Sequence, residues 1–367
     1  MISASGAVRV HMTGSEWFGA APGGLGRYFT DLHGALLDVP GISLSAAAFG
    51  PPDRTVAGTR SWGPVGGSTL RRARTAFCAR DALDPGTVVD RHFCLYGPVA
   101  RDRRGRRLPL VVHFHGPWAA ESRMHGQHPA AAFAKYLIER LRYVCADRFV
   151  VLSDHFRTVL CEDYRIASDR VEVIAPGVDL TRFRAAPVPA SPPVVLCVRR
   201  LERRMGIDVL LRAWPGVLAE HPEARLVIVG TGSAEADLRR GAIEGGLDGS
   251  VEFTGRIPDQ ELAARYTSAA LTVVPTVALE GFGLIALESL AAGRAPVVTR
   301  CGGLPDAVRG LDPSLIVPPG DPAALAARIS AAISGCRPTP EQCRAHAETF
   351  SWHAAAQRHA ALYRELG

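Results

Sequence analysis

Short apolar runs alternate with helix-length amphipathic segments along nearly all of this 367-residue chain. The runs are rich in Val, Ile and Leu with little polar alternation, which is typical of parallel strands buried on both faces. Repeated strand–helix units predict a doubly wound α/β fold. We expect strands at 8–12, 110–115, 148–153, 171–175, 194–199, 225–230, 251–254, 271–275 and 296–299, and helices at 26–37, 130–145, 208–221 and 282–292.

The length suits two domains of roughly 150–190 residues each. Segment 185–193 reads AAPVPASPP, and four prolines in nine residues exclude a regular helix or a central strand. We therefore place an interdomain linker there. The expected organisation is an N-terminal Rossmann-like domain at 1–186, a similar C-terminal domain at 187–350, and a last helix at 351–367 that packs on the first domain. Such domains bind ligands at the carboxyl ends of their strands, so we expect them to face each other across a cleft.

Composition narrows the class of protein. Apolar residues make up 47% and charged residues 21%, which suits an enzyme with buried cores, and the net charge of +6 is too modest to imply nucleic acid. The eight cysteines show no metal-site spacing, so we expect free thiols in a reducing cytosol. No signal-peptide core and no apolar stretch of 18 residues occurs, which predicts a cytoplasmic protein without a membrane span.

Two arginine clusters need an explanation. The first contains Arg71, Arg72 and Arg74, and the second is RDRRGRR at 101–107. A basic helix face and a basic loop are the expected structures. A solvated surface explains both clusters, and contact with an anionic acceptor or an anionic membrane surface stays open as the alternative.

The most informative segment is LEGFGLIALE, which contains Glu280 and Glu288. Its glycines follow an expected buried strand and precede a helix, and this arrangement directs backbone N–H groups and a helix N-terminus toward an anion. Helix capping explains one acid at such a place but not two, and a capping acid followed by a solvated glutamate in the helix stays open as the alternative. Carboxylates accept hydrogen bonds from sugar hydroxyls, so the pair suits a phosphate-linked, hydroxyl-rich ligand.

Three further segments lie at expected strand ends. Gly23 and Gly24 belong to a glycine-rich turn whose amides can approach a phosphate, although a simple turn explains them equally well. His113 and His115 lie on one side of a strand end, where structural histidines are the alternative. Arginines at 199, 200, 203 and 204 follow a strand of the second domain and match the charge of a diphosphate, with a solvated loop as the alternative. The sequence contains no DxD motif, so we expect no metal, and no GxSxG or HExxH motif is present.

Taken together, the chain resembles the retaining glycosyltransferases of family 4 over residues 9–362. The resemblance rests on nine segments in the family order: GGLGRY, HFHG, VLSDHF, VIAPGVDLTRF, VRRLERRMG, ARLVIVGTG, VEFTGRI, EGFGLIALE and APVVTRCGGLPD. It implies the GT-B fold, in which two Rossmann-like domains face each other. It also implies metal-independent, front-face transfer of a hexose from a UDP- or GDP-sugar to an acceptor hydroxyl, with no cofactor besides the donor.

Residue roles follow from the resemblance position by position. Glu280, His115 and Arg200 take the catalytic positions: Glu280 and His115 contact the transferred sugar, and Arg200 binds the diphosphate. The donor-binding positions are Gly23, Gly24, Arg204, Gly255, Arg256, Ile257, Gly281, Phe282, Gly283, Leu284 and Glu288, with Glu288 on the ribose and residues 255–257 beside the base.

One position departs from the family. Met205 stands where a lysine is usual, so either Arg203 or Arg204 supplies the missing charge, or one cation fewer holds the diphosphate. The acceptor is not specified: a glycan, a lipid-linked intermediate and a small-molecule natural product all remain open, with Trp17, Phe18 and Trp118 as candidate contacts. A sugar-nucleotide epimerase and a non-catalytic nucleotide-sugar-binding protein are the alternative functions.

Overall fold

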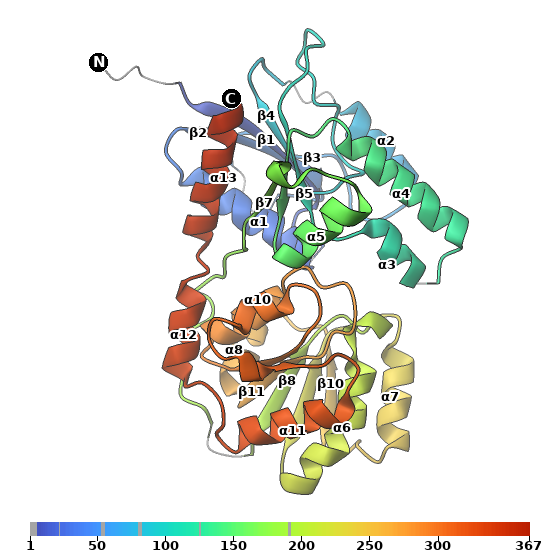
Figure 1. The fold of residues 1–367 in the computed structure, drawn as a ribbon, viewed down its shortest axis with the longest axis vertical. Helices are drawn as coiled ribbons and strands as arrows, with labels where there is room; N and C mark the ends of the chain where they lie inside the picture. Colours follow the sequence, from blue (N-terminus) through green and yellow to red (C-terminus); the bar gives the residue numbers. More distant parts are fainter. Residues whose placement is uncertain (1–5, 22, 53–55, 80–82, 125, 190–191) are drawn as a thin grey trace. The chain divides into compact units, whose positions relative to one another are not determined.

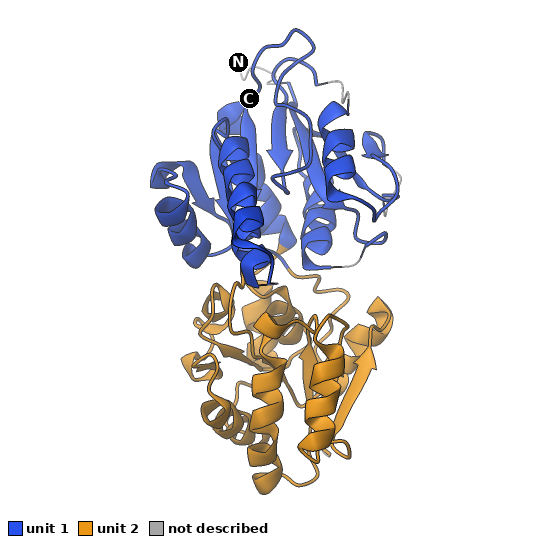
Figure 2. Cartoon of the chain, turned by 90° about the vertical axis from the view of Figure 1, so that its right-hand side faces the viewer, with its two compact units in different colours: residues 1–177, 352–367 blue, residues 178–351 orange. Residues whose placement is uncertain are grey.

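The computed structural model describes residues 6–21, 23–52, 56–79, 83–124, 126–189 and 192–367. They form two compact units, which are coloured separately in Figure 2. Unit 1 lies within residues 1–177 and 352–367, and unit 2 within residues 178–351. The chain therefore passes between the units at two places, 177/178 and 351/352.

This division differs from the expected boundary at 186/187, because the proline-rich segment belongs to unit 2. Arg294, which is fully buried, explains the difference. Its guanidinium donates hydrogen bonds to the carbonyls of Ala186 at 2.6 Å and Pro187 at 2.9 Å. The described part of the segment, residues 185–189 and 192–193, contains no helix or strand, as expected, but it is bound to unit 2 and does not link the units.

Unit 1 contains a seven-stranded parallel sheet in the order β3-β2-β1-β4-β5-β6-β7 (Figure 1). The strands are β1 (Val8–Glu16), β2 (Ile42–Phe49), β3 (Thr59–Ser61), β4 (Val88–Arg91), β5 (Leu110–Phe114), β6 (Arg148–Val151) and β7 (Val171–Val173). The helices are α1 (Gly24–Leu37), α2 (Thr69–Cys78), α3 (Trp118–Met124), α4 (Pro129–Tyr143), α5 (Asp154–Asp163) and α13 (Trp352–Leu366), with a 3₁₀ turn at Ser168–Arg170.

Unit 2 contains a six-stranded parallel sheet in the order β10-β9-β8-β11-β12-β13. The strands are β8 (Val194–Val198), β9 (Arg225–Val229), β10 (Val251–Gly255), β11 (Leu271–Val274), β12 (Pro296–Thr299) and β13 (Ile316–Val317). The helices are α6 (Ile207–Glu220), α7 (Glu235–Glu244), α8 (Asp259–Ser268), α9 (Leu284–Ala291), α10 (Leu304–Val308), α11 (Pro322–Ile333) and α12 (Pro340–Glu348), with 3₁₀ turns at Arg203–Met205 and Pro313–Leu315.

Both sheets reverse their strand order once, which confirms the prediction of two doubly wound domains. The reversal lies between β1 and β4 in unit 1 and between β8 and β11 in unit 2. Ligands of such sheets bind beyond the carboxyl ends of the strands at this switch point. The segments that follow β1, β4, β8 and β11 are therefore the places where these units are suited to bind a ligand.

Every strand expected from the apolar pattern is present, but four strands were not predicted. β4 is the most instructive, because its sequence is VVDR and all four residues are buried. A strand that is half charged does not stand out as an apolar run, although the sheet buries it completely. Among the described residues, no helix has the length and apolar character needed to cross a membrane.

Candidate functional site

The loop after β11 presents Glu280 beside the end of β8. Arg199, which follows β8 directly, donates from Nη2 to the hydroxyl of Thr276 and to the carboxylate of Glu280. Both side chains of the ion pair are well buried, at 7% exposure for Arg199 and 15% for Glu280. The neighbouring Leu279 has a positive φ of 55°, a conformation that costs free energy in a non-glycine residue. The fold therefore fixes Glu280 in a constrained loop against a buried arginine.

A second buried arginine supports the same loop. Arg204 donates from Nη1 to the carbonyl of Leu279 at 2.8 Å, and its own carbonyl accepts from Val277 N at 2.9 Å. Burial alone would raise the pKa of Glu280. The charge and hydrogen bond of Arg199, followed by the charge of Arg204, instead hold that pKa below its ordinary value. Glu280 is thus an anion at neutral pH and can accept hydrogen bonds from hydroxyl groups.

Glycine permits the tight backbone packing around this loop. Gly302 has φ +56°, and a Cβ there would lie 1.9 Å from the carbonyl oxygen of Glu280. Gly206 has φ +69°, and a Cβ there would lie 2.0 Å from the carbonyl oxygen of Pro275. Any side chain at these positions would displace the loop that carries Glu280.

Glu288 lies on α9, the helix that follows the same loop. It is buried, and its Oε2 accepts a hydrogen bond from Tyr266 Oη at 2.9 Å. α9 starts after Gly283, whose φ of +89° is accessible to glycine. Glu280 and Glu288 therefore belong to one continuous loop–helix element, but their side chains have different protein partners.

The residues between Glu280 and Glu288 differ in how deeply their side chains are buried. Phe282 is buried and packs edge-on against Phe350, with ring centroids 5.7 Å apart. Its side chain is thus part of the unit 2 core, and only its backbone is suited to a ligand. The hydrogen bond from Gly281 N to the Glu280 carboxylate helps to lower the pKa of Glu280. Leu284 is the first residue of α9 and is partly exposed.

The predicted diphosphate arginine, Arg200, lies in a different environment from Arg199. Arg200 is exposed, and among the described residues no ion pair is recorded for its guanidinium. Met205 is buried at 4% exposure in the 3₁₀ turn before α6, whereas Arg203 is exposed. Of the two arginines expected to replace the missing lysine, Arg204 reaches the Glu280 loop.

Gly255, Arg256 and Ile257 lie where the edge strand β10 ends. Gly255 has φ +69°, and its carbonyl accepts from Gly230 N at 2.8 Å. Arg256 is exposed and Ile257 partly exposed before α8 begins. β9 separates β10 from β8, so these residues are on the carboxyl edge of the sheet but not at its switch point.

In unit 1, a buried carboxylate organises a group of histidines. Asp90 at the end of β4 lies 2.9 Å from both His92 Nε2 and His113 Nε2, and it accepts from Tyr363 Oη at 2.8 Å. Burial would raise the Asp90 pKa, but His113 and His92 lower it well below its usual range. Tyr363 lies on α13, so this contact anchors the last helix within unit 1.

His115 follows β5 at the edge of this histidine group. Its ring packs edge-on against Tyr28 with centroids 5.0 Å apart, and it lies 5.8 Å from the rings of His92 and His113. Burial, with the neighbouring histidines next in size, lowers the His115 pKa well below its ordinary value. His115 is therefore neutral at physiological pH and is suited to hydrogen bonding with a ligand.

The ring geometry of this group does not suit a metal ion. His92, His113 and His115 each offer a nitrogen within 4.8 Å of the other two. However, the rings of His92 and His113 are stacked at 3.8 Å with an interplanar angle of only 20°. A metal binds in the plane of an imidazole ring along the nitrogen lone pair, so one ion cannot lie in the planes of two stacked rings.

Gly23 and Gly24 lie at the N-terminus of α1, which begins beyond β1 at the switch point of unit 1. Both are exposed, and a Cβ at either position would meet no other atom within 4 Å. The backbone is therefore accessible at the positive end of a 14-residue helix, which suits an anion. Among the candidate acceptor contacts in this region, Trp17 is wrong, because its side chain is 1% exposed and packs in the core.

The two arginine clusters have separate environments. Arg71 and Arg74 are exposed on α2, whereas Arg72 turns inward to pair with Glu16. The second cluster is the expected loop, closed by an antiparallel bridge between residues 101 and 107. Arg107 pairs there with Asp147 at 2.6 Å.

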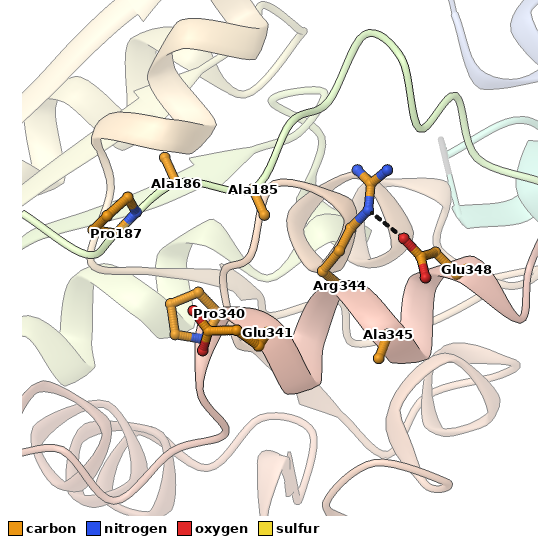
Figure 3. Close-up of a pocket in the computed structure, with 8 residues that line it drawn as sticks. All are labelled: Ala185, Ala186, Pro187, Pro340, Glu341, Arg344, Ala345 and Glu348. Carbon is orange, nitrogen blue, oxygen red and sulfur yellow. Dashed lines mark hydrogen bonds and ion pairs between the residues drawn. The ribbon is translucent and has the colours of Figure 1, made fainter.

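A surface pocket in unit 2 contains none of the predicted site residues (Figure 3). It has a volume of about 290 Å³ and lies between the segment 185–187 and α12. Its arginine, Arg344, already pairs with Glu348 at 2.9 Å and donates to the carbonyl of Phe183 at 2.7 Å. Arg344 and Glu348 therefore bind each other and the backbone of unit 2, which leaves them little capacity to bind a ligand.

Sequence reasoning missed two important residues. Arg199 was one member of an arginine run, and nothing in the sequence distinguishes it from Arg200, because both follow β8 directly. Asp90 lay in a strand that was not predicted. A signal was present in the DRH sequence, because two residues apart in an extended segment an acid and a histidine lie on the same side.

Comparison with known proteins adds independent information. Residues 192–334 match the family described as "Glycosyl transferases group 1", and residues 22–182 match "Glycosyltransferase Family 4". The D-inositol 3-phosphate glycosyltransferase of Thermobispora bispora is 33% identical over 77% of this chain and 72% of its own length.

Two solved structures illustrate the fold likeness. Sucrose-phosphate synthase from Thermosynechococcus elongatus superposes with a TM-score of 0.79 at 23% identity, covering 98% of both chains. Anabaena HepE in complex with UDP-glucose gives 0.72 at 17% identity, covering 98% of this chain and 100% of its own.

Proposed function

Since this chain belongs to the group 1 glycosyltransferases of family 4, we propose that it moves a hexose-type sugar from a nucleoside-diphosphate sugar to an acceptor hydroxyl with retention at the anomeric carbon. The expected GT-B fold is confirmed by the two parallel-sheet units and by the likeness to solved glycosyltransferases. The chain is accordingly a transferase.

The observation that carries the proposal is the buried Glu280 anion at the switch point of unit 2. A carboxylate held by Arg199 in a constrained loop is preorganised to accept hydrogen bonds from hydroxyls of the transferred sugar. Glu288, further along the same element, is proposed to bind the ribose hydroxyls. The backbone of residues 281–284 and the side chain of Arg200 would then hold the diphosphate.

A UDP-sugar is the first donor to test, with a GDP-sugar as the alternative. The complex of Anabaena HepE with UDP-glucose shows that a protein of this fold binds such a donor. Residues 255–257 at the end of β10 are the proposed neighbours of the base. The exposed Arg200 and the helix N-terminus of α9 supply the positive potential that a diphosphate requires.

For the acceptor, a phosphorylated polyol is the first class to test, because the T. bispora relative is named for D-inositol 3-phosphate. The proposed transfer breaks the bond between the anomeric carbon and the diphosphate oxygen. The acceptor oxygen forms the new bond on the same face, and its proton passes to the leaving diphosphate. His115, which is neutral, is proposed to hydrogen-bond the reacting sugar, and Gly23 and Gly24 to assist with their amides.

The proposal is tested by incubating the purified protein with a panel of UDP- and GDP-sugars and with inositol phosphate, glycan and lipid-linked acceptors. Mass spectrometry should detect a product heavier than the acceptor by one hexose unit, in EDTA as well as in its absence. NMR should show that the anomeric configuration of the donor is retained. An epimerised donor in the absence of acceptor, an inverted product, or binding without any turnover would each contradict the proposal.

A further inference from the structure

An exposed surface of unit 1 combines apolar and basic side chains. Ten large apolar side chains are exposed among the described residues, and seven of them lie on α2, on α3, on α4 or directly after α4. Leu70 on α2 is 78% exposed, and Leu141 and Val144 at the end of α4 are each 72% exposed. We define the α2/α4 surface by Leu70, Arg71, Arg74, Phe77, Phe133, Leu137, Arg140, Leu141 and Val144.

These residues form stripes on two adjacent helices. On α4, the residues at 133, 137, 141 and 144 recur at helical spacing and therefore lie on one face, as do those at 70, 74 and 77 on α2. Arg142 on α4 lies with its guanidinium 5.9 Å from the ring centroid of Phe77 on α2, so the two helices are neighbours (Figure 1). The two stripes therefore lie on neighbouring helices of unit 1.

The two segments that supply this surface contain almost no acidic residues. Residues 56–79 contain no Asp or Glu, and residues 126–146 contain only Glu139. Glu139 is buried, where its carboxylate accepts from Trp118 N at 2.9 Å and from Tyr164 Oη at 2.8 Å. The exposed Arg71, Arg74 and Arg140 therefore have no carboxylate within these segments to neutralise them.

We propose that the α2/α4 surface docks on an anionic lipid bilayer. Interfacial membrane binding has a typical pattern. Apolar side chains enter the boundary between headgroups and acyl chains, and flanking arginines contact the phosphate groups. A second copy of the chain fits this surface poorly, because a two-fold contact would bring its arginines together without acids between them. The inference does not depend on the donor or acceptor proposed above.

Sedimentation of the full chain with vesicles tests the inference. We expect binding to vesicles of phosphatidylglycerol and phosphatidylcholine, and none to phosphatidylcholine alone. Two variants, Leu137→Gln/Leu141→Gln and Arg71→Glu/Arg74→Glu, should each bind at least about tenfold more weakly. Each basic residue near an anionic surface contributes on the order of fivefold, so losing two arginines alone costs about 25-fold. The leucine pair loses the burial of its apolar side chains in the interface. All four positions are exposed, so the variants should fold normally.

Matched controls lie in unit 2. Ile243→Gln removes an exposed apolar side chain on α7, and Arg240→Glu reverses an exposed charge on the same helix. Both should bind vesicles like the wild type. The inference is overturned if the wild-type chain does not bind anionic vesicles, or if the controls lose as much binding as the α2/α4 variants. It is also overturned if the wild-type chain self-associates without binding vesicles and the α2/α4 variants abolish that self-association.

Discussion

Arg199 and Glu280 form a buried ion pair between the segments that follow β8 and β11, and Arg199 also donates to Thr276 from the same nitrogen. The adjacent Arg200 is exposed. Two consecutive arginines thus have different environments. Arg199 is a positioning residue for Glu280, whereas the side chain of Arg200 is accessible to a diphosphate from the solvent. This difference leads to contrasting predictions for the two side chains.

Replacing Arg199 by Ala should affect both stability and transfer. The change leaves the mostly buried Glu280 carboxylate without its ion-pair partner, so we expect a loss of about 3 kcal/mol in unfolding free energy and a lower kcat. Arg199→Lys should recover part of both. Arg200→Ala should leave stability within about 0.5 kcal/mol and raise the donor KM. Urea unfolding and steady-state kinetics check this, and equal stability losses for Arg199→Ala and Arg200→Ala would contradict it.

The close packing of Gly302 against Glu280 gives a second prediction. Gly302→Ala places a methyl group 1.9 Å from the Glu280 carbonyl oxygen, so the loop must move and kcat/KM should fall at least tenfold. Gly320→Ala is the matched control, because Gly320 also has a positive φ, of 74°, but a Cβ there meets nothing within 4 Å. The control should lose only stability. Equal transfer rates for the two variants would show that the loop position is unimportant.

The buried histidines of unit 1 predict loss of stability in mild acid. Burial lowers the pKa of His33, His113 and His359 to about 4 each, below the value of about 6.5 expected in the unfolded chain. Between about pH 4 and pH 6.5, the unfolded chain therefore binds more protons than the folded protein does. The stabilisation is complete above pH 6.5 and declines as the pH falls toward 4. Thermal unfolding of unit 1 should shift to lower temperature over this range, and a constant Tm between pH 7 and pH 5 would refute the prediction.

The contact of Tyr363 with Asp90 predicts how α13 is held in unit 1. Tyr363→Phe removes one hydrogen-bond donor from a fully buried carboxylate, which should lower the unfolding free energy by about 1–3 kcal/mol. Tyr136→Phe removes an exposed hydrogen bond to the Asp163 carbonyl and should cost less than about 1 kcal/mol. Chemical unfolding measures the free energy of unfolding of both variants. Similar losses in the two would show that the buried contact between Tyr363 and Asp90 contributes no more stability than the exposed one.

The sequence predicted the parts of the fold that depend on local pattern. Buried parallel strands have nearly continuous apolar runs, so nine strands and the loop–helix element from Glu280 to Glu288 could be placed in advance. β4 could not, because Asp90 and Arg91 occupy half of it and are stabilised by partners distant in sequence, such as Tyr363. Contacts between residues distant in sequence produce no periodic pattern of apolar residues, so the sequence does not predict this strand.

The candidate site shows the same limit. The resemblance to family 4 directed attention to Arg200, while the contact with Glu280 is made by Arg199. Which of two adjacent arginines turns inward depends on the pleat and twist of β8 relative to β11, and sequence spacing does not determine that. The proline-rich segment was likewise correctly expected to be irregular, but its attachment to unit 2 depends on Arg294, over 100 residues later.

In the proposed mechanism, the Glu280 anion stabilises the sugar during transfer. The most direct test is the initial rate of transfer by Glu280→Gln, which keeps the size of the side chain but removes its charge, with circular dichroism to verify folding. We predict a loss of at least about 100-fold in kcat, typical of removing a preorganised electrostatic contact. A folded Glu280→Gln variant, or a folded Glu280→Ala variant, that retains full transfer activity would contradict the account.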